Sequence, residues 1–80
     1  MFSRIQRKFA DRRLILRAQV STGGRQNHRL SGLTQVYLHA VGLSDDLPEF
    51  GGMADRAESA LRAVAGGMAV EDAMRAFRIG

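Results

Sequence analysis

The chain has 80 residues, of which 45% are hydrophobic and 25% are charged, and its formal net charge is +4. A chain of this length holds at most one domain and is too short for a Rossmann fold or a barrel enzyme. The absence of cysteine excludes disulfides, thiolate metal sites and a cysteine nucleophile, and favours a cytoplasmic protein. No signal-peptide core is visible, and no run approaches the roughly 20 apolar residues of a membrane span.

Charge is divided unevenly along what we expect to be a single small domain, residues 1–80. Residues 1–43 carry eight basic residues and one acidic residue, whereas residues 44–80 carry four basic and seven acidic residues. Eleven of the twelve basic residues are arginines, and guanidinium groups suit bidentate recognition of phosphate or carboxylate better than lysine does. The division predicts a basic N-terminal half and an acidic, helical C-terminal half.

Residues 3–21 favour a helix, because nearly every residue within them is a good helix former and Ser3 with Gln6 matches a capping box. The pair Gly23–Gly24 then supplies a stop. At 100° per residue, one narrow apolar stripe is predicted to face the core; it consists of Phe2, Ile5, Phe9, Leu16 and Val20. A shorter helix followed by a strand stays open, since Leu14, Leu16, Ala18 and Val20 alternate with the residues between them.

A polar, basic loop is expected at residues 22–31, followed by a second helix at residues 32–42. Ser31 is a possible cap and Gly42 a stop. The apolar face of this helix is predicted to hold Leu33, Val36, Tyr37, Ala40 and Val41. Several of these residues also favour sheets, so an α+β fold with a small antiparallel hairpin or meander from residues 13–41 is the alternative.

Two further helices are predicted after an irregular linker that contains Pro48. The first spans residues 53–65 and ends at Gly66–Gly67; its apolar face holds Met53, Ala57, Ala60, Leu61 and Val64. The second spans residues 69–78 and buries Val70, Ala73, Met74 and Phe77. Acidic residues in its first turn and arginines near its end complement the helix dipole; they are Glu71, Asp72, Arg75 and Arg78.

These elements predict an all-α fold, a compact bundle of about four short helices. Its expected core consists of Phe2, Ile5, Phe9, Leu16, Val36, Tyr37, Val41, Leu61, Val64, Met74 and Phe77. The last 15 residues resemble the first helix and turn of a helix-turn-helix, as in resolvase and transposase DNA-binding domains. Val70 and Ala73 match buried positions, Phe77 and Ile79 packing positions, and Gly80 the turn. Because the chain ends where the recognition helix would begin, we interpret this segment as a packing helix.

The basic N-terminal half is the main functional signal. In a helix, Arg4, Lys8 and Arg12 would form one row at spacings of four, and Arg13 with Arg17 a second. Together with two loop arginines they make the predicted partner-binding residues: Arg4, Lys8, Arg12, Arg13, Arg17, Arg25 and Arg29. Such a cluster can neutralise phosphates, or it can pair with the chain's own acids. Aromatic residues interleaved for base stacking are missing, because Phe2 and Phe9 lie on the predicted core stripe.

The remaining motifs point to no chemistry. The glycines before Arg25 could cradle an anion, but a helix-ending or hairpin turn is favoured, because no P-loop pattern follows. His28 and His39 match no metal motif and are expected at the surface. The acidic cluster before the third helix, Asp45, Asp46 and Glu49, does not match a calcium loop. It is interpreted as a loop and capping region, or alternatively as an acidic docking patch.

We therefore expect no catalysis, no cofactor and no metal. The leading hypothesis is a small non-enzymatic interaction or regulatory protein that docks its basic face on an acidic or nucleic-acid-bearing partner, possible roles including inhibition of a nucleoprotein complex. In size it is similar to phage-encoded anti-CRISPR proteins, a similarity of scale that no residue motif carries. The alternatives are an autonomous, non-specific DNA- or RNA-binding protein, and a homo-oligomer, a homodimer at its smallest, in which basic and acidic halves meet head to tail.

Overall fold

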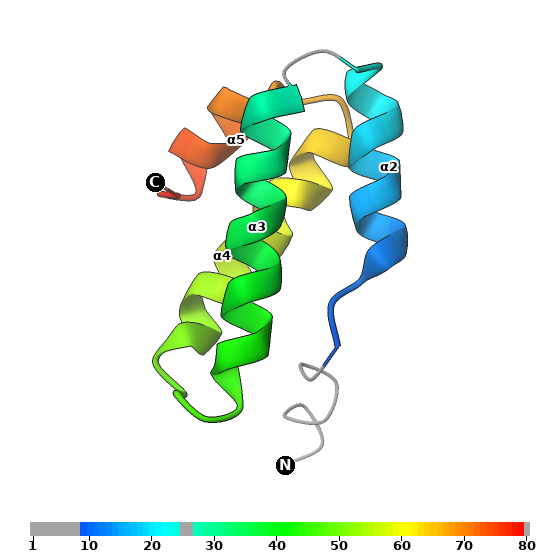
Figure 1. The fold of residues 1–80 in the computed structure, drawn as a ribbon. Helices are drawn as coiled ribbons and strands as arrows, with labels where there is room; N and C mark the ends of the chain where they lie inside the picture. The colour runs from blue at the N-terminus through cyan, green and yellow to red at the C-terminus, as the bar shows by residue number, and fades with distance from the viewer. Residues whose placement is uncertain (1–8, 25–26, 80) are drawn as a thin grey trace.

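The computed structural model describes residues 9–24 and 27–79, and over these residues the chain is helical, without strands (Figure 1). Four helices are described: α2 (Arg12–Thr22), α3 (Asn27–Ser44), α4 (Phe50–Ala65) and α5 (Val70–Ala76). α4 packs against the other three, and α5 lies across one end of α3 and α4 (Figure 1). The all-α bundle is confirmed. The alternative hairpin is wrong, because α2 and α3 occupy its residues. None of the described helices is long and apolar enough to cross a bilayer.

α2 begins at Arg12, not at Ser3 as predicted, because Asp11 caps it. The Asp11 backbone is extended, with φ −84° and ψ 97°, and its Oδ1 accepts a hydrogen bond of 3.1 Å from the Leu14 N–H. An aspartate in this position satisfies one of the unpaired N–H groups of a first helical turn. Residues 9–11 are not helical, and the predicted capping box of Ser3 lies outside the described residues.

The inward face of α2 is opposite to the predicted one. Leu14 and Ala18 are buried, with 2% and 0% of their surface exposed, whereas Leu16 and Val20 are 60% and 79% exposed. Phe9, placed on the same predicted stripe, is 76% exposed. The predicted stripe is therefore wrong for its described members, and Phe2 and Ile5 lie outside the described residues.

Arginines beside the predicted stripe explain this outcome. At 100° per residue, Arg12 and Arg13 lie on either side of the line through Leu16 and Val20. Turning that line inward would carry both guanidinium groups into the helix interface, where an unpaired charge costs several kcal/mol. Burying the face of Leu14 and Ala18 leaves both of these arginines in solvent, and Arg17, at the side of that face, is exposed as well.

Small side chains form the centre of the core. Five residues of α4 have 0% exposure: Ala54, Ala57, Ala60, Leu61 and Val64. Four of them match the predicted face, but Met53 is 37% exposed and Ala54 takes the inward place. α4 also begins at Phe50, three residues earlier than predicted. Alanines let neighbouring helices approach closely, as the dense packing of protein interiors requires.

α3 is longer than the predicted helix at residues 32–42. It starts at Asn27, so the predicted loop loses its second half, and Leu30 joins the core at 3% exposure. Ser31 is an exposed residue inside the helix and not its cap, and Gly42 does not end it. The buried residues of α3 are Leu30, Leu33, Tyr37, Ala40 and Val41. Val36 is half-buried at the edge of the core.

α5 ends two residues before the predicted Arg78, in a turn that reverses the chain. Arg78 has a left-handed backbone with φ 58°, and the Ile79 N–H donates to the Met74 carbonyl at 2.8 Å. This bond from the second residue past the C-cap, Phe77, is the mark of a Schellman motif. Ile79 thereby packs against the core beside Met74 and Phe77, both of which are half-buried.

Alanine substitutions in α2 test which of its faces is buried. We expect Leu14→Ala to lower the free energy of unfolding by roughly 2 to 5 kcal/mol, because it leaves a cavity in the core. Leu16→Ala, its control on the exposed face, should change it by no more than about 0.5 kcal/mol. Urea unfolding followed by circular dichroism measures both. Equal losses for the two variants would contradict the orientation of α2.

Tyr37 ties the start of α2 to α3. Its ring is 2% exposed, and its hydroxyl oxygen accepts a hydrogen bond of 2.8 Å from the Asp11 N–H, 26 residues earlier in the chain. The bond holds the capping residue of α2 against the middle of α3. It therefore helps to set both where α2 starts and how it is rotated.

Removing this hydroxyl should loosen the N-terminal end of α2. We expect Tyr37→Phe to cost about 1 kcal/mol, because the ring still fills the core while the Asp11 N–H loses its partner. Amide hydrogen exchange should show faster exchange at Asp11 than in the unmodified protein. Unchanged protection at Asp11 would mean that the hydroxyl does not hold the helix start.

Candidate functional site

The strongest candidate is the solvent-facing side of α2, which we call the outer face. It consists of Arg12, Arg13, Leu16, Arg17 and Val20, all of them exposed. Burial of Leu14 and Ala18 on the opposite side of the helix turns these five residues outward. Two aliphatic side chains therefore lie at the centre of a solvent-exposed face, with guanidinium groups on both sides.

The arginines of the outer face make no ion pair with any residue in the described ranges. Other arginines do: Arg29 binds Glu71, Arg62 Nη2 lies 2.9 Å from Glu58 Oε2, and Arg75 lies 3.7 Å from Asp72. The hydrogen bond to the Glu58 carboxylate, with its negative charge, raises the pKa of the Arg62 guanidinium. Ion pairs among the described residues thus involve these three arginines, whereas the arginines of the outer face stay available to bind a partner.

Only part of the predicted basic cluster comes together. Of the seven predicted residues, Arg12, Arg13 and Arg17 share the outer face, whereas Arg29 lies in the first turn of α3 and binds Glu71 of α5. Arg4, Lys8 and Arg25 lie outside the described residues. The predicted row through Arg12 cannot run along one continuous helix, because residues 9–11 are not helical.

A shallow hollow of about 420 Å³ continues the outer face toward the end of α4. It is lined by Leu16, Arg17, Val20 and Ser21 of α2 and by Ala65, the last residue of α4. This lining offers aliphatic carbon with a guanidinium group at its side. It suits an apolar side chain that has a carboxylate nearby. The sequence prediction missed Leu16 and Val20 as surface residues, although the arginines next to them were a usable signal.

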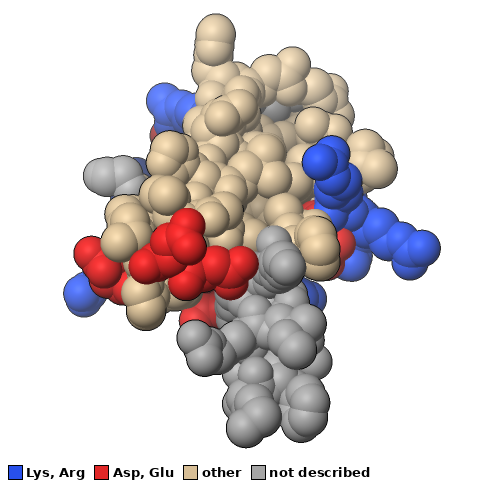
Figure 2. Space-filling view, turned by 60° about the horizontal axis from the view of Figure 1, so that its bottom comes forward, with Lys and Arg blue, Asp and Glu red and all other residues tan. Residues whose placement is uncertain are grey.

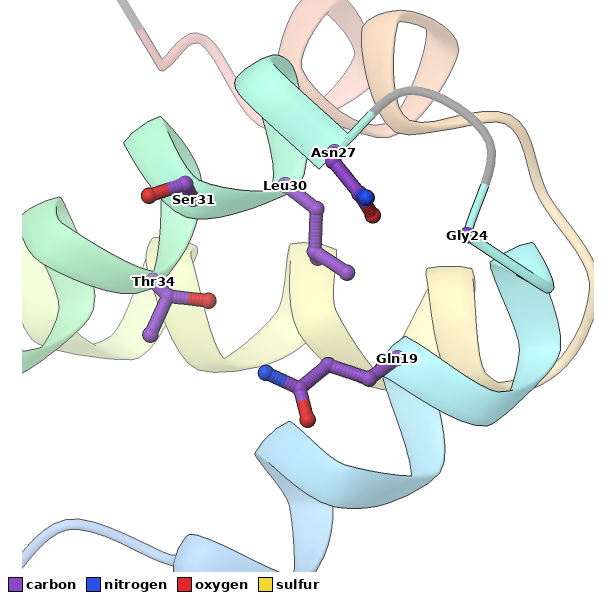
Figure 3. A pocket seen from close by; sticks show the side chains of 6 residues that line it. All are labelled: Gln19, Gly24, Asn27, Leu30, Ser31 and Thr34. Carbon is purple, nitrogen blue, oxygen red and sulfur yellow. The ribbon is translucent and has the colours of Figure 1, made fainter.

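A second hollow of about 420 Å³ lies between α2 and α3 and is lined by uncharged groups (Figure 3). Its lining residues are Gln19, Gly24, Asn27, Leu30, Ser31 and Thr34. Figure 3 shows Gln19 and Leu30 turned toward the space between the helices, whereas Ser31 points away from it. The buried Thr34 Oγ1 has no hydrogen-bond partner among the described residues. A threonine hydroxyl in a helix can reach the carbonyl of the preceding turn, so this orphan does not require a ligand.

An acidic surface lies where α3 turns into α4, and we call Asp45, Asp46, Leu47 and Glu49 the acidic end. All four are exposed. Figure 2 shows acidic side chains gathered on the end of the molecule turned toward the viewer, with basic side chains at its margins. Glu49 precedes the first turn of α4 but its side chain makes no capping hydrogen bond. The predicted capping role is therefore wrong for Glu49.

The histidines and glycines singled out in the sequence take simple structural positions. His28 and His39 are exposed on α3, as expected. Gly23 ends α2 with a left-handed backbone, φ 61°, and its N–H donates to the Val20 carbonyl at 3.1 Å, which confirms the helix-ending turn. Within residues 9–24 and 27–79, no three histidine or carboxylate side chains gather as a metal site would require.

Comparison with family models, with curated proteins and with solved structures finds no match to this chain. Among the described residues, the outer face of α2 is the surface whose chemistry points most directly to a function.

Proposed function

We propose that this chain is a small, non-enzymatic interaction protein that docks the outer face of α2 on an acidic partner protein. One observation carries the proposal: Arg12, Arg13 and Arg17 surround two exposed aliphatic side chains and form no ion pair with a described residue. A partner covered in this way is blocked for other ligands. Inhibition or regulation of the partner is the expected consequence.

Leu16 and Val20 favour a protein as the partner. They are 60% and 79% exposed, and full burial of such a side chain contributes roughly 1.5 to 3 kcal/mol. A protein surface with its own apolar residues can provide that burial, whereas hydrated phosphates cannot. An apolar centre with a charged rim is also the usual anatomy of a protein interface. The rim arginines would steer the encounter and set its orientation.

Nucleic acid is the second candidate, and Phe9 favours it. The sequence predicted that Phe9 lies in the core, which would leave no aromatic residue for base stacking. In the structure, Phe9 is 76% exposed. Phe9 lies three residues before α2 and its arginines. A single strand can stack its bases on exposed aromatics while arginines contact its phosphates. Because the outer face itself contains aliphatic and not aromatic side chains, we rank this candidate below a protein partner.

Neutralising the outer face should weaken binding to an acidic partner. We expect the triple variant Arg12→Gln, Arg13→Gln, Arg17→Gln to bind a labelled helical peptide with a Glu-flanked leucine face at least roughly tenfold more weakly, a loss of about 1.4 kcal/mol. Fluorescence anisotropy at roughly 50 and 300 mM salt measures it, because surface charges are screened as salt rises.

The matched control is the triple variant Arg56→Gln, Arg75→Gln, Arg78→Gln. It removes the same charge from three exposed arginines elsewhere and should bind the peptide as the unmodified protein does. If both triples lose affinity equally, binding follows net charge and the outer face has no special role.

Polar substitution of the aliphatic pair distinguishes the two candidate functions. We expect the double variant Leu16→Ser, Val20→Ser to lose roughly tenfold in affinity for the peptide and to keep its affinity for duplex and single-stranded DNA, which contact the arginines. Peptide binding that survives this double substitution would contradict a protein partner. Single-strand binding that is tight, strongly salt-dependent and lost in Phe9→Ser would favour nucleic acid instead.

A further inference from the structure

We infer that a second copy of this chain can occupy the outer face, with its acidic end seated on α2, so that molecules associate head to tail. This goes beyond the proposed function, because it assigns a role to a second surface. The inference rests on the complementary chemistry of two faces that the fold keeps apart.

The acidic end is as available as the outer face. Asp45, Asp46 and Glu49 are exposed and none forms an ion pair with a residue of the described ranges. Leu47 lies among them with 41% of its surface exposed, and Met53, one turn into α4, is 37% exposed. Backbone hydrogen bonds hold the turn in place, including 2.8 Å from the Leu47 N–H to the Leu43 carbonyl.

The two faces match in composition with opposite charge. Three carboxylates beside an exposed leucine would meet three guanidinium groups around Leu16 and Val20. Arginine and carboxylate form the strongest of the side-chain ion pairs, because two parallel hydrogen bonds can link them. The shallow hollow at Leu16, Val20 and Ala65 could receive an aliphatic side chain such as Leu47. Arg56 is a nearby exposed cation on α4, and it only partly offsets the carboxylates.

The arrangement of the helices requires a second molecule for this contact. The outer face lies on the solvent side of α2, whereas the acidic end lies at the turn that joins α3 to α4, apart from α2 (Figure 1). A symmetric dimer through two outer faces would place arginines against arginines, and like charges in contact are unfavourable. A head-to-tail contact leaves one free face at each end, so it continues into short chains or closes as a ring. It also covers the outer face, so a partner and a second copy would compete.

The test mixes two variants that each lack one face. The outer-face variant is Arg12→Gln, Arg13→Gln, Arg17→Gln, and the acidic-end variant is Asp45→Asn, Asp46→Asn, Glu49→Gln. Sedimentation at low salt from about 10 µM to 1 mM spans the range expected of a weak association. We expect the mass of the unmodified protein to rise with concentration and to fall to that of a monomer at high salt. Each variant alone should stay monomeric at least roughly tenfold further in concentration.

An equimolar mixture of the two variants should form a one-to-one dimer that does not grow, because only one complementary contact remains. The control triple at Arg56, Arg75 and Arg78 should associate at least as strongly as the unmodified protein, because it keeps both faces and removes a cation near the acidic end. Circular dichroism checks that all variants are folded, which we expect because every substituted side chain is exposed.

Three results would overturn the inference: a monomer at every concentration in low salt, undiminished association in either variant, or no dimer in the mixture. The proposed function is tested separately. The acidic-end variant keeps the outer face and should bind the acidic peptide normally. Peptide binding without self-association would contradict only the inference. Self-association without peptide binding would contradict only the proposed function.

Discussion

Close packing on the alanine face of α4 is the constraint on which the rest of this structure depends. α4 makes the most extensive contacts with the other described helices, and Ala54, Ala57 and Ala60 are completely buried. An alanine buries little surface by itself, so these contacts exclude water only if the helices lie close together. Ala18 on α2 meets this requirement, because a small side chain on the facing helix lets the two helix backbones lie close together. The larger side chains of Leu14, Tyr37 and Leu61 then fill the space that remains.

This packing has a direct consequence for function. With Ala18 and Leu14 turned toward α4, and with Asp11 bound to the Tyr37 hydroxyl, the rotation of α2 is determined. Its arginines and two aliphatic residues must then face solvent together. The outer face is therefore the other side of a well-packed helix, with a backbone held in place by the core. A rigid surface loses less conformational entropy on binding than a mobile one, which suits a docking role.

The division of charge along the sequence becomes a different division in space. Arg29 comes from the basic half and Glu71 from the acidic half, yet the fold brings them together as an ion pair between α3 and α5. Within the acidic half, Arg62 and Arg75 are paired with carboxylates one turn away. What remains unpaired among the described residues includes two compact groups of opposite sign, on α2 and at the turn between α3 and α4. Surface charges of this kind act over about 8 to 10 Å at physiological salt, so binding through them should be reversible and sensitive to ionic strength.

The sequence by itself determined the helical class, most of the buried residues of α3 and α4, the stop at Gly66–Gly67 and the acidic start of α5. Apolar spacing, glycine pairs and charge order are local signals, and they act within one helix wherever it lies. Two outcomes were decided by tertiary structure. Asp11, held by Tyr37 from 26 residues away, set the start of α2, and the choice between its two apolar faces followed from packing on α4. Periodicity showed that α2 has apolar residues on more than one side; only the alanines of another helix, and the cost of burying Arg12 and Arg13, decided which side is inside.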